Sequence, residues 1–345
     1  MGIHLDDEWN VCHPGNGNAV NVAAAVGNLI KRVVGTVDRF QQTHAPFAFA
    51  YGVIKKFGDD RGGQLGGLIA FYAFLSFFPL MLVVVTLTAF LAHNNAHLAH
   101  QIRDSALSQF PVVGPDLAST DKALPGSGLG LAVGIIGLVW GAMGVTQAVQ
   151  YAVAEVWHVP YRERAPFITR LVRGISLFVL LGLGVVATAL LASLGAVVSN
   201  STLAGVAGFV AGVVLSIGLY LTVFRVLSPK HCGWRDMLPG AIVAGIAWQI
   251  LELVGVQLVQ HQLKHSSQLY GTAGVVLGLI SFLLLVAQIT LYGLEINAVR
   301  VLKLWPRSIA APPYTDADHE MLRILAKQEE RAPGQQVRVE FDEVG

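Results

Sequence analysis

The chain has 345 residues, of which 54% are hydrophobic and only 13% are charged, and its net charge is +1. Ordinary soluble domains carry about 25% charged residues, so this composition excludes a typical water-exposed protein and indicates a surface solvated by lipid. The small net charge also excludes a broad basic field of the kind that attracts nucleic acid, and we expect no nucleic-acid partner.

The chain begins with segment 1–45, which is rich in Gly, Asn, Ala and Val and is expected to be a flexible tail with room for one short helix. Segment 46–57 combines apolar side chains with a lysine pair, and these residues are Phe47, Tyr51, Ile54, Lys55 and Lys56. We predict an amphipathic helix that lies in the membrane interface before the first span.

Long blocks without Asp, Glu, Lys or Arg follow at 62–92, 123–154, 174–224 and 265–294, and the block 237–263 contains a single charge. A spanning helix needs about 20 apolar residues. The block 174–224 is long enough for two helices, with a polar turn at 199–202. The sequence therefore predicts an all-α integral membrane protein, a six-transmembrane-helix bundle with spans at about 67–92, 128–151, 175–198, 203–227, 238–259 and 271–298.

The first predicted span contains a proline, Pro79, within an uncharged stretch. The proline leaves the carbonyl of Leu75 without its helical donor, which predicts a kink. We expect Tyr72, Ser76 and Pro79 to face the interior of the bundle. Two interpretations stay open: a kink with local hydrogen bonds, or part of a polar path for a substrate.

Glycines recur in the second span at alternating spacings of four and three residues. This pattern places them on one face of the helix, where a neighbouring backbone can approach closely. Packing within the bundle is the first interpretation, and a sliding surface for a conformational cycle is the second. The glycines are Gly130, Gly134, Gly137, Gly141 and Gly144.

Polar side chains inside the fifth and sixth spans are functional candidates, because ionisable groups are costly in a membrane. Glu252 lies well inside the fifth span, and Gln249 shares its helix face. They form either a head-group or proton site or a protonated glutamate satisfied by a neighbouring helix. Glu295 and Asn297 end the sixth span and Arg225 ends the fourth, so we expect a Glu295–Arg225 pair that locks two helices or forms a gate.

Lysine and arginine residues are divided unevenly between the two sides of the predicted bundle. Twenty fall in the two terminal segments and the second and fourth connections, and three fall in the other connections. Positively charged loops stay in the cytoplasm, so both termini are predicted to be cytoplasmic. Cys12 and Cys232 lie on this reducing side, where a structural disulfide is not expected.

Two external connections carry histidines at helical spacings, which can share a metal ion. Polar loops produce such spacings easily, so these residues are only weak metal candidates and no cofactor is expected. They are His93, His97, His100, His261 and His265.

The chain thus divides into three parts. Segment 1–45 is the cytoplasmic N-terminal tail, 46–305 is the six-span membrane domain, and 306–345 is a cytoplasmic C-terminal tail with a charged helix near 316–331.

Four short stretches carry a family resemblance: FYAFLSFFPL at 71–80, WRDMLPGA at 234–241, YGT at 270–272 and LYGLEINA at 291–298. Together they resemble the YihY/virulence factor BrkB family of bacterial inner-membrane proteins over roughly 45–305. Relatives often have Asn at the end of the second span, where this chain has Ala154 and Glu155 before Trp157. A role that depends on that Asn is therefore not carried over.

The resemblance implies a bacterial cytoplasmic membrane protein linked to envelope lipid or lipopolysaccharide traffic and to virulence. Members were long labelled ribonuclease BN, a label generally regarded as mistaken. The residues also argue against this activity, because a metal nuclease needs clustered carboxylates or histidines and here they are scattered over the cytoplasmic segments.

The expected function is the movement or handling of a lipid or other amphipathic envelope molecule, without covalent chemistry of the protein's own. Membrane lipids are the expected partners, and a homo-oligomer stays open. The alternative is a non-transporting scaffold for envelope or division machinery, in which the tails and loops would matter more than intramembrane polar groups.

Overall fold

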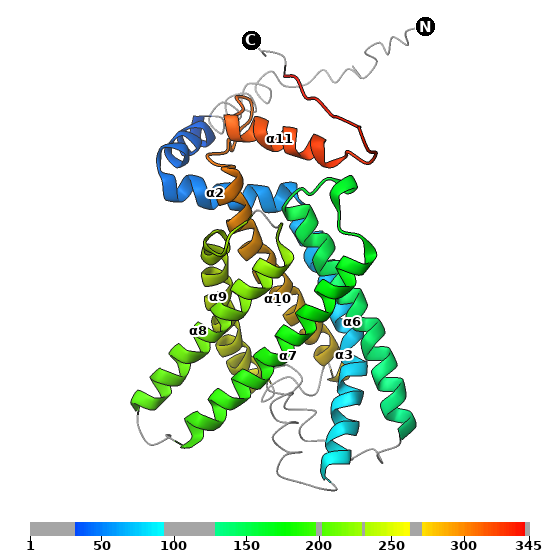
Figure 1. Cartoon of the computed structure of the whole chain (residues 1–345). Coiled ribbons are helices and arrows are strands. Elements are labelled where there is room, and N and C mark those ends of the chain that lie inside the picture. Colours follow the sequence, from blue (N-terminus) through cyan, green and yellow to red (C-terminus); the bar gives the residue numbers. More distant parts are fainter. Residues whose placement is uncertain (1–31, 93–127, 198–201, 230–231, 263–270, 342–345) are drawn as a thin grey trace, which may run out of the picture.

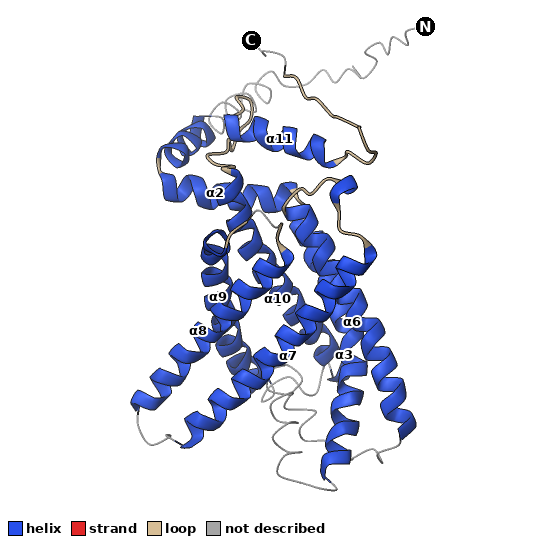
Figure 2. Cartoon of the chain, viewed as in Figure 1, coloured by secondary structure: helices blue, strands red, loops and turns tan. Residues whose placement is uncertain are grey.

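The computed structural model describes residues 32–92, 128–197, 202–229, 232–262 and 271–341. Every regular element within these ranges is helical (Figure 2). The elements are a helix over 32–43, α2 (Ala45–Asp59), α3 (Gly62–Ala92), α6 (Gly128–Val156), the single-turn 3-10 helix η1 (Tyr161–Glu163), α7 (Phe167–Val197), α8 (Thr202–Leu227), α9 (Trp234–Gln262), α10 (Gly271–Leu302) and α11 (Asp316–Gln328).

Six of these helices, α3 and α6 to α10, are long and apolar enough to cross a membrane, which confirms the six predicted spans. Some helices continue beyond the predicted limits, since α7 begins at Phe167 rather than near 175, and α9 begins at Trp234 rather than near 238. The extensions carry charged residues, because a helix does not have to end where the hydrocarbon ends.

The helices pack in two groups around α10, which contacts α3 and α6 on one side and α9 on the other (Figure 1). Helices α8 and α9 contact each other, and α7 packs on α8 and on α6. Large apolar side chains cover much of the outer surface of the spans; Ile136, for example, is 71% exposed. Such a surface is expected where lipid is the solvent.

The glycine face of α6 packs directly on α3, as the packing interpretation expects. A Cβ at Gly141 would lie 2.8 Å from the Cα of Ser76, and one at Gly137 would lie 3.1 Å from Pro79 Cγ. A Cβ at Gly144 would likewise collide with the Tyr72 ring, and one at Gly134 would lie close to Leu82 and Val83. Gly130 lies in α6, but its surroundings are outside the described side chains. The missing side chains therefore let two spanning helices approach closely.

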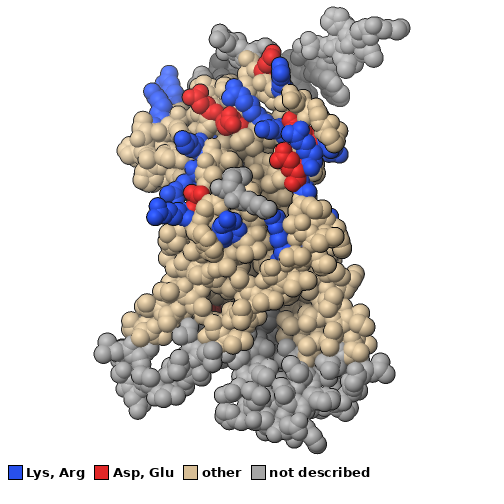
Figure 3. Space-filling model, viewed as in Figure 1, with Lys and Arg blue, Asp and Glu red and all other residues tan. Residues whose placement is uncertain are grey.

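Charged side chains gather at one end of the bundle, which we call the charged end and which comprises residues 32–61, 155–173 and 300–341 (Figure 3). Helix α2 and helix α11 lie across this end (Figure 1). The predicted helix in the C-terminal segment is confirmed as α11, which begins with a capping box between Thr315 and Asp318. The other described residues of that segment, 306–315 and 329–341, form no regular element.

Candidate functional site

Helices α9 and α10 cross in close contact near the charged end. The Cβ position of Gly240 would lie 1.9 Å from the carbonyl oxygen of Gly293, so no larger residue fits there. The Gly240 N–H donates to Asn297 Oδ1 at 2.8 Å, and Asn297 is fully buried. Asn297 therefore joins the two spans at this crossing rather than facing an open path.

A buried ion cluster lies next to this crossing. Lys56 Nζ of α2 lies 2.8 Å from Glu295 Oε2 and 2.6 Å from Asp60 Oδ2, and all three side chains are inaccessible to solvent. Lys56 also donates to the carbonyl oxygen of Val156 at 2.8 Å. The predicted Glu295–Arg225 pair is therefore wrong, because the interface helix brings Lys56 closer to Glu295 than the end of α8 brings Arg225.

Lys56 and Asp60 of this cluster stabilise each other's charges. Burial alone would lower the pKa of the Lys56 ammonium, but the Glu295 and Asp60 carboxylates raise it above its ordinary value. Burial likewise opposes ionisation of Asp60, yet the His158 ring, whose Nε2 lies 3.3 Å from Oδ1, and the charge of Lys56 lower the pKa of Asp60. Lys56 and Asp60 are therefore a buried ion pair at the junction of α2 and α3.

A series of contacts between polar side chains leads from this cluster to the end of α6 and to α11. His158 Nε2 lies 3.3 Å from Asp60 Oδ1, and its Nδ1 lies 2.7 Å from Gln328 Oε1. Gln328 also donates to Glu155, which binds Arg164 at 2.8 Å. His158, which appears isolated in the sequence, therefore connects a span to the C-terminal helix.

A second polar cluster docks the C-terminal segment on α2. Asp318 accepts from Lys55 Nζ at 2.9 Å, from Arg307 and from the Ser308 N–H at 3.0 Å. These donors outweigh burial and hold the pKa of Asp318 well below its usual range. Asp38 of the helix over 32–43 accepts from the Ile309 N–H at 3.0 Å. The C-terminal segment is thus tied both to α2 and to the helix over 32–43.

The candidate polar residues of the spans lie in separate helix contacts. Gln249 Nε2 donates to Glu252 Oε2 at 2.7 Å, and a Cβ at Gly212 of α8 would lie 2.9 Å from Gln249 Oε1. This pair belongs to the α8–α9 contact, whereas Tyr72, Ser76 and Pro79 belong to the α3–α6 contact. Ser76 bonds locally, to the carbonyl of Ala73 at 2.8 Å, as the kink interpretation expects.

The histidines that are weak metal candidates lie almost entirely outside the described residues. His93, His97, His100 and His265 are outside the described residues, and only the backbone of His261 is described, in α9. Among the residues that the structure describes, no group of three or more His, Cys, Asp or Glu side chains could hold a metal ion.

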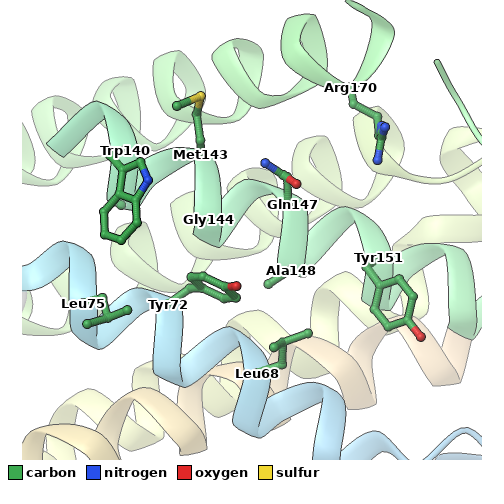
Figure 4. A pocket seen from close by; sticks show the side chains of 11 residues that line it. Leu68, Tyr72, Leu75, Trp140, Met143, Gly144, Gln147, Ala148, Tyr151 and Arg170 are labelled. Carbon is green, nitrogen blue, oxygen red and sulfur yellow. The ribbon is translucent and has the colours of Figure 1, made fainter. Parts of the chain in front are cut away.

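Three adjoining pockets lie along α6, and Gln147 and Arg170 line all three. We call them together the α6 recess. The first, of about 440 Å³, lies between α3 and α6, with Tyr72 facing α6 and Arg170 reaching in from α7 (Figure 4). The second, of about 380 Å³, is an apolar groove between α6 and α7 in which Val139 and Phe178 are typical lining residues. The third, of about 440 Å³, is the basic pocket at the charged end.

The basic pocket is lined by three arginines, one from the turn between η1 and α7 and two from α7 itself: Arg164, Arg170 and Arg173. Among the described ion pairs, Arg164 binds Glu155, whereas none uses Arg170 or Arg173. In the sequence these two arginines contribute only to the distribution of positive charge that predicts orientation. Their spacing of three residues at the start of a span places them on one helix face, and this signal could have marked them as a site.

The comparisons with known proteins agree with this architecture. A family model described as "Virulence factor BrkB" matches residues 53–310. Over 293 residues, which are 77% of this chain and 85% of the relative, the chain is 22% identical to "Inner membrane protein YhjD" of Escherichia coli (strain K12). No solved structure matches. The relative and the six spans show a multi-pass protein of the bacterial inner membrane, and the chain belongs to the virulence factor BrkB family.

Proposed function

We propose that this protein binds and moves a lipid or similar amphipathic molecule of the cell envelope, using the α6 recess. The observation that carries the proposal is the continuity of the recess. Gln147, Gln150 and Arg170 line both the apolar groove and the basic pocket. A molecule with one apolar and one polar end would find matching surroundings along a single helix.

The two ends of the recess differ in polarity: the groove is mostly apolar, and the basic pocket is lined by arginines. In the groove between α6 and α7 the polar lining residues are Thr146, Gln147, Gln150 and Arg170, and all are near the charged end. An acyl chain would lie against the remaining apolar residues at little cost. A polar head group would stay hydrated or bonded beside the arginines.

We infer from the positive-inside rule that the charged end faces the cytoplasm. The head group would then enter from the cytoplasmic leaflet. No covalent step is proposed, and the described residues contain no metal-binding cluster. Movement would depend on an ion gradient, on a partner protein, or on passive exchange between leaflets.

The test is lipid translocation in proteoliposomes with a groove-filling variant. Val139→Trp places a bulky ring in the groove, since Val139 is 53% exposed and lines it. Ile136→Trp is the matched control, because Ile136 is 71% exposed on the same helix and lines none of the three pockets. The proposal predicts that only Val139→Trp slows translocation. Equal rates in both variants would show that the groove is not the path.

The scaffold alternative is tested by shortening the termini. The C-terminal segment cannot be removed at 306, because Arg307, Ser308 and Asp318 belong to the fold. Deletion of 1–31 or of 342–345 leaves every described contact in place. A transporter should keep its activity in both deletions, whereas a scaffold that binds through these ends should lose its partner in a pull-down.

A further inference from the structure

We propose that the basic pocket binds the phosphate of an anionic glycerophospholipid, with its acyl chains in the groove between α6 and α7. This inference rests on the proposed function and adds the class of lipid. It follows from the charges around the pocket, from the position of the pocket beside the start of α7, and from the apolar surface that adjoins it.

The positive charge of the pocket has two sources that act in the same direction. Arg170 and Arg173 lie in the first two turns of α7, and neither takes part in a described ion pair. The N-terminus of a helix carries roughly half a positive charge and favours anions, and the first turn of α7 contains no acidic residue. A phosphate beside these arginines would be stabilised by both.

The other ionisable groups around the basic pocket do not cancel the positive charge of Arg170 and Arg173. Arg164 is held by Glu155 at 2.8 Å, so it contributes little free charge. Glu163 lines the pocket and opposes an anion, but its side chain is 57% exposed and lies 3.4 Å from Arg162. His158 is engaged with Asp60 and Gln328. Arg170 and Arg173 therefore determine the preference of the pocket.

A lipid is favoured over a free phosphate because Arg170 lines the groove as well as the pocket. The groove continues from Arg170 past Leu171 to Phe178 along α7, and its opposite wall is formed by Val139 and Ala142 of α6. A soluble anion would use only the arginines. A phospholipid would use both surfaces and bury its chains against the groove.

The experiment measures lipid binding to the full-length protein in detergent by native mass spectrometry, with phosphatidylglycerol and phosphatidylcholine of the same chain length. An anionic lipid gains about 1 kcal/mol from each nearby Lys or Arg, which corresponds to about fivefold in affinity. We expect Arg170→Gln and Arg173→Gln each to weaken phosphatidylglycerol binding about fivefold and the double variant about 25-fold. Phosphatidylcholine binding should change little.

Two controls separate charge from folding and from general surface attraction. The variant Arg170→Lys/Arg173→Lys keeps the charge and should keep the preference. Arg300→Gln removes an exposed arginine elsewhere at the charged end and should leave the preference intact. Glycerol phosphate, which lacks acyl chains, should not displace the lipid at equal concentration.

Equal affinity of the wild type for both lipids, or full preference in the double glutamine variant, would overturn the inference. Displacement by glycerol phosphate would also overturn it, because the site would then serve a soluble anion. Translocation without anionic preference contradicts this inference alone. Arginine-dependent preference without translocation contradicts the proposed function alone.

Discussion

Lys56 and Glu295 are 239 residues apart in the sequence, yet Nζ of one lies 2.8 Å from Oε2 of the other, and both side chains are completely buried. The contact joins the helix that lies across the charged end to the central span. Asp60 and His158 extend it to α3 and α6. One buried lysine thus holds together elements from three regions of the chain.

Replacing Lys56 should be strongly destabilising. Lys56→Met leaves the Glu295 and Asp60 carboxylates buried without their cation, and loss of one partner of a buried pair costs about 3–5 kcal/mol. We expect a large fall in the melting temperature of the detergent-solubilised protein. The double variant Lys56→Met/Glu295→Met should be more stable than the single variant. Equal stability of the two would contradict a charge origin.

Docking of the C-terminal segment should depend on pH through Asp318. Its pKa is lowered in the folded state by Lys55, Arg307 and two backbone N–H groups. A carboxyl group with a lowered pKa stabilises the folded state above its ordinary pKa of 3.8, and this contribution is lost as the pH falls below that value. Protection factors of the α11 amides, which correct for the intrinsic pH dependence of exchange, should therefore stay high at neutral pH and fall in strong acid.

Asp318→Asn should remove most of this dependence. The variant keeps the shape of the side chain but lacks the charge that binds Lys55 and Arg307. We expect lower protection factors in α11 at pH 7 and little further change in acid. Asp316→Asn is the control, because it changes an acidic residue in the same first turn for which the structure shows no ion pair. An Asp318→Asn profile identical to the wild type would contradict the assignment.

The contact between α3 and α6 should not tolerate a single methyl group at Gly141. Its Cβ would lie 2.8 Å from the backbone of Ser76, which cannot rotate away. Overpacking of this kind costs about 1–3 kcal/mol, so Gly141→Ala should lower the melting temperature. Gly182→Ala on α7 is the control, since a Cβ there meets nothing within 4 Å. Equal effects at both sites would rule out close helix approach as the cause.

Glu252→Gln tests the remaining intramembrane candidate. The change keeps the size of the side chain beside Gln249, so folding should be unaffected. If Glu252 bonds a head group or carries a proton, a contact of about 1.5–3 kcal/mol disappears, and translocation should fall about tenfold or more. Unchanged transport in both Glu252→Gln and Glu295→Gln would exclude these residues from the path.

The spans and the glycine contact between α3 and α6 could be predicted because both leave periodic signals. Uncharged blocks of sufficient length gave six spans, and the alternating glycine spacing identified the face of α6 that packs on α3. These features depend on residues that are neighbours along one helix. The local pattern around Thr315 and Asp318 likewise marks the start of α11.

The buried ion cluster could not be predicted in the same way. In the sequence, Lys56 belongs to the polar side of a predicted interface helix. Arg225 and Glu295 both lie near the cytoplasmic ends of predicted spans, so the sequence favours a pair between these two residues. Their contact depends on how α2 lies across the bundle, which no local pattern records. His158 appeared isolated for the same reason, since its partners Asp60 and Gln328 are distant in sequence.

The most direct test of the central claim is the translocation of head-group-labelled lipids in proteoliposomes that contain the wild-type protein, compared with empty vesicles. Each lipid class is measured separately, with anionic and zwitterionic head groups in parallel. We expect at least one class, and first an anionic phospholipid, to cross faster than in empty vesicles. Vesicle-level rates for every class would contradict lipid movement and would favour the scaffold.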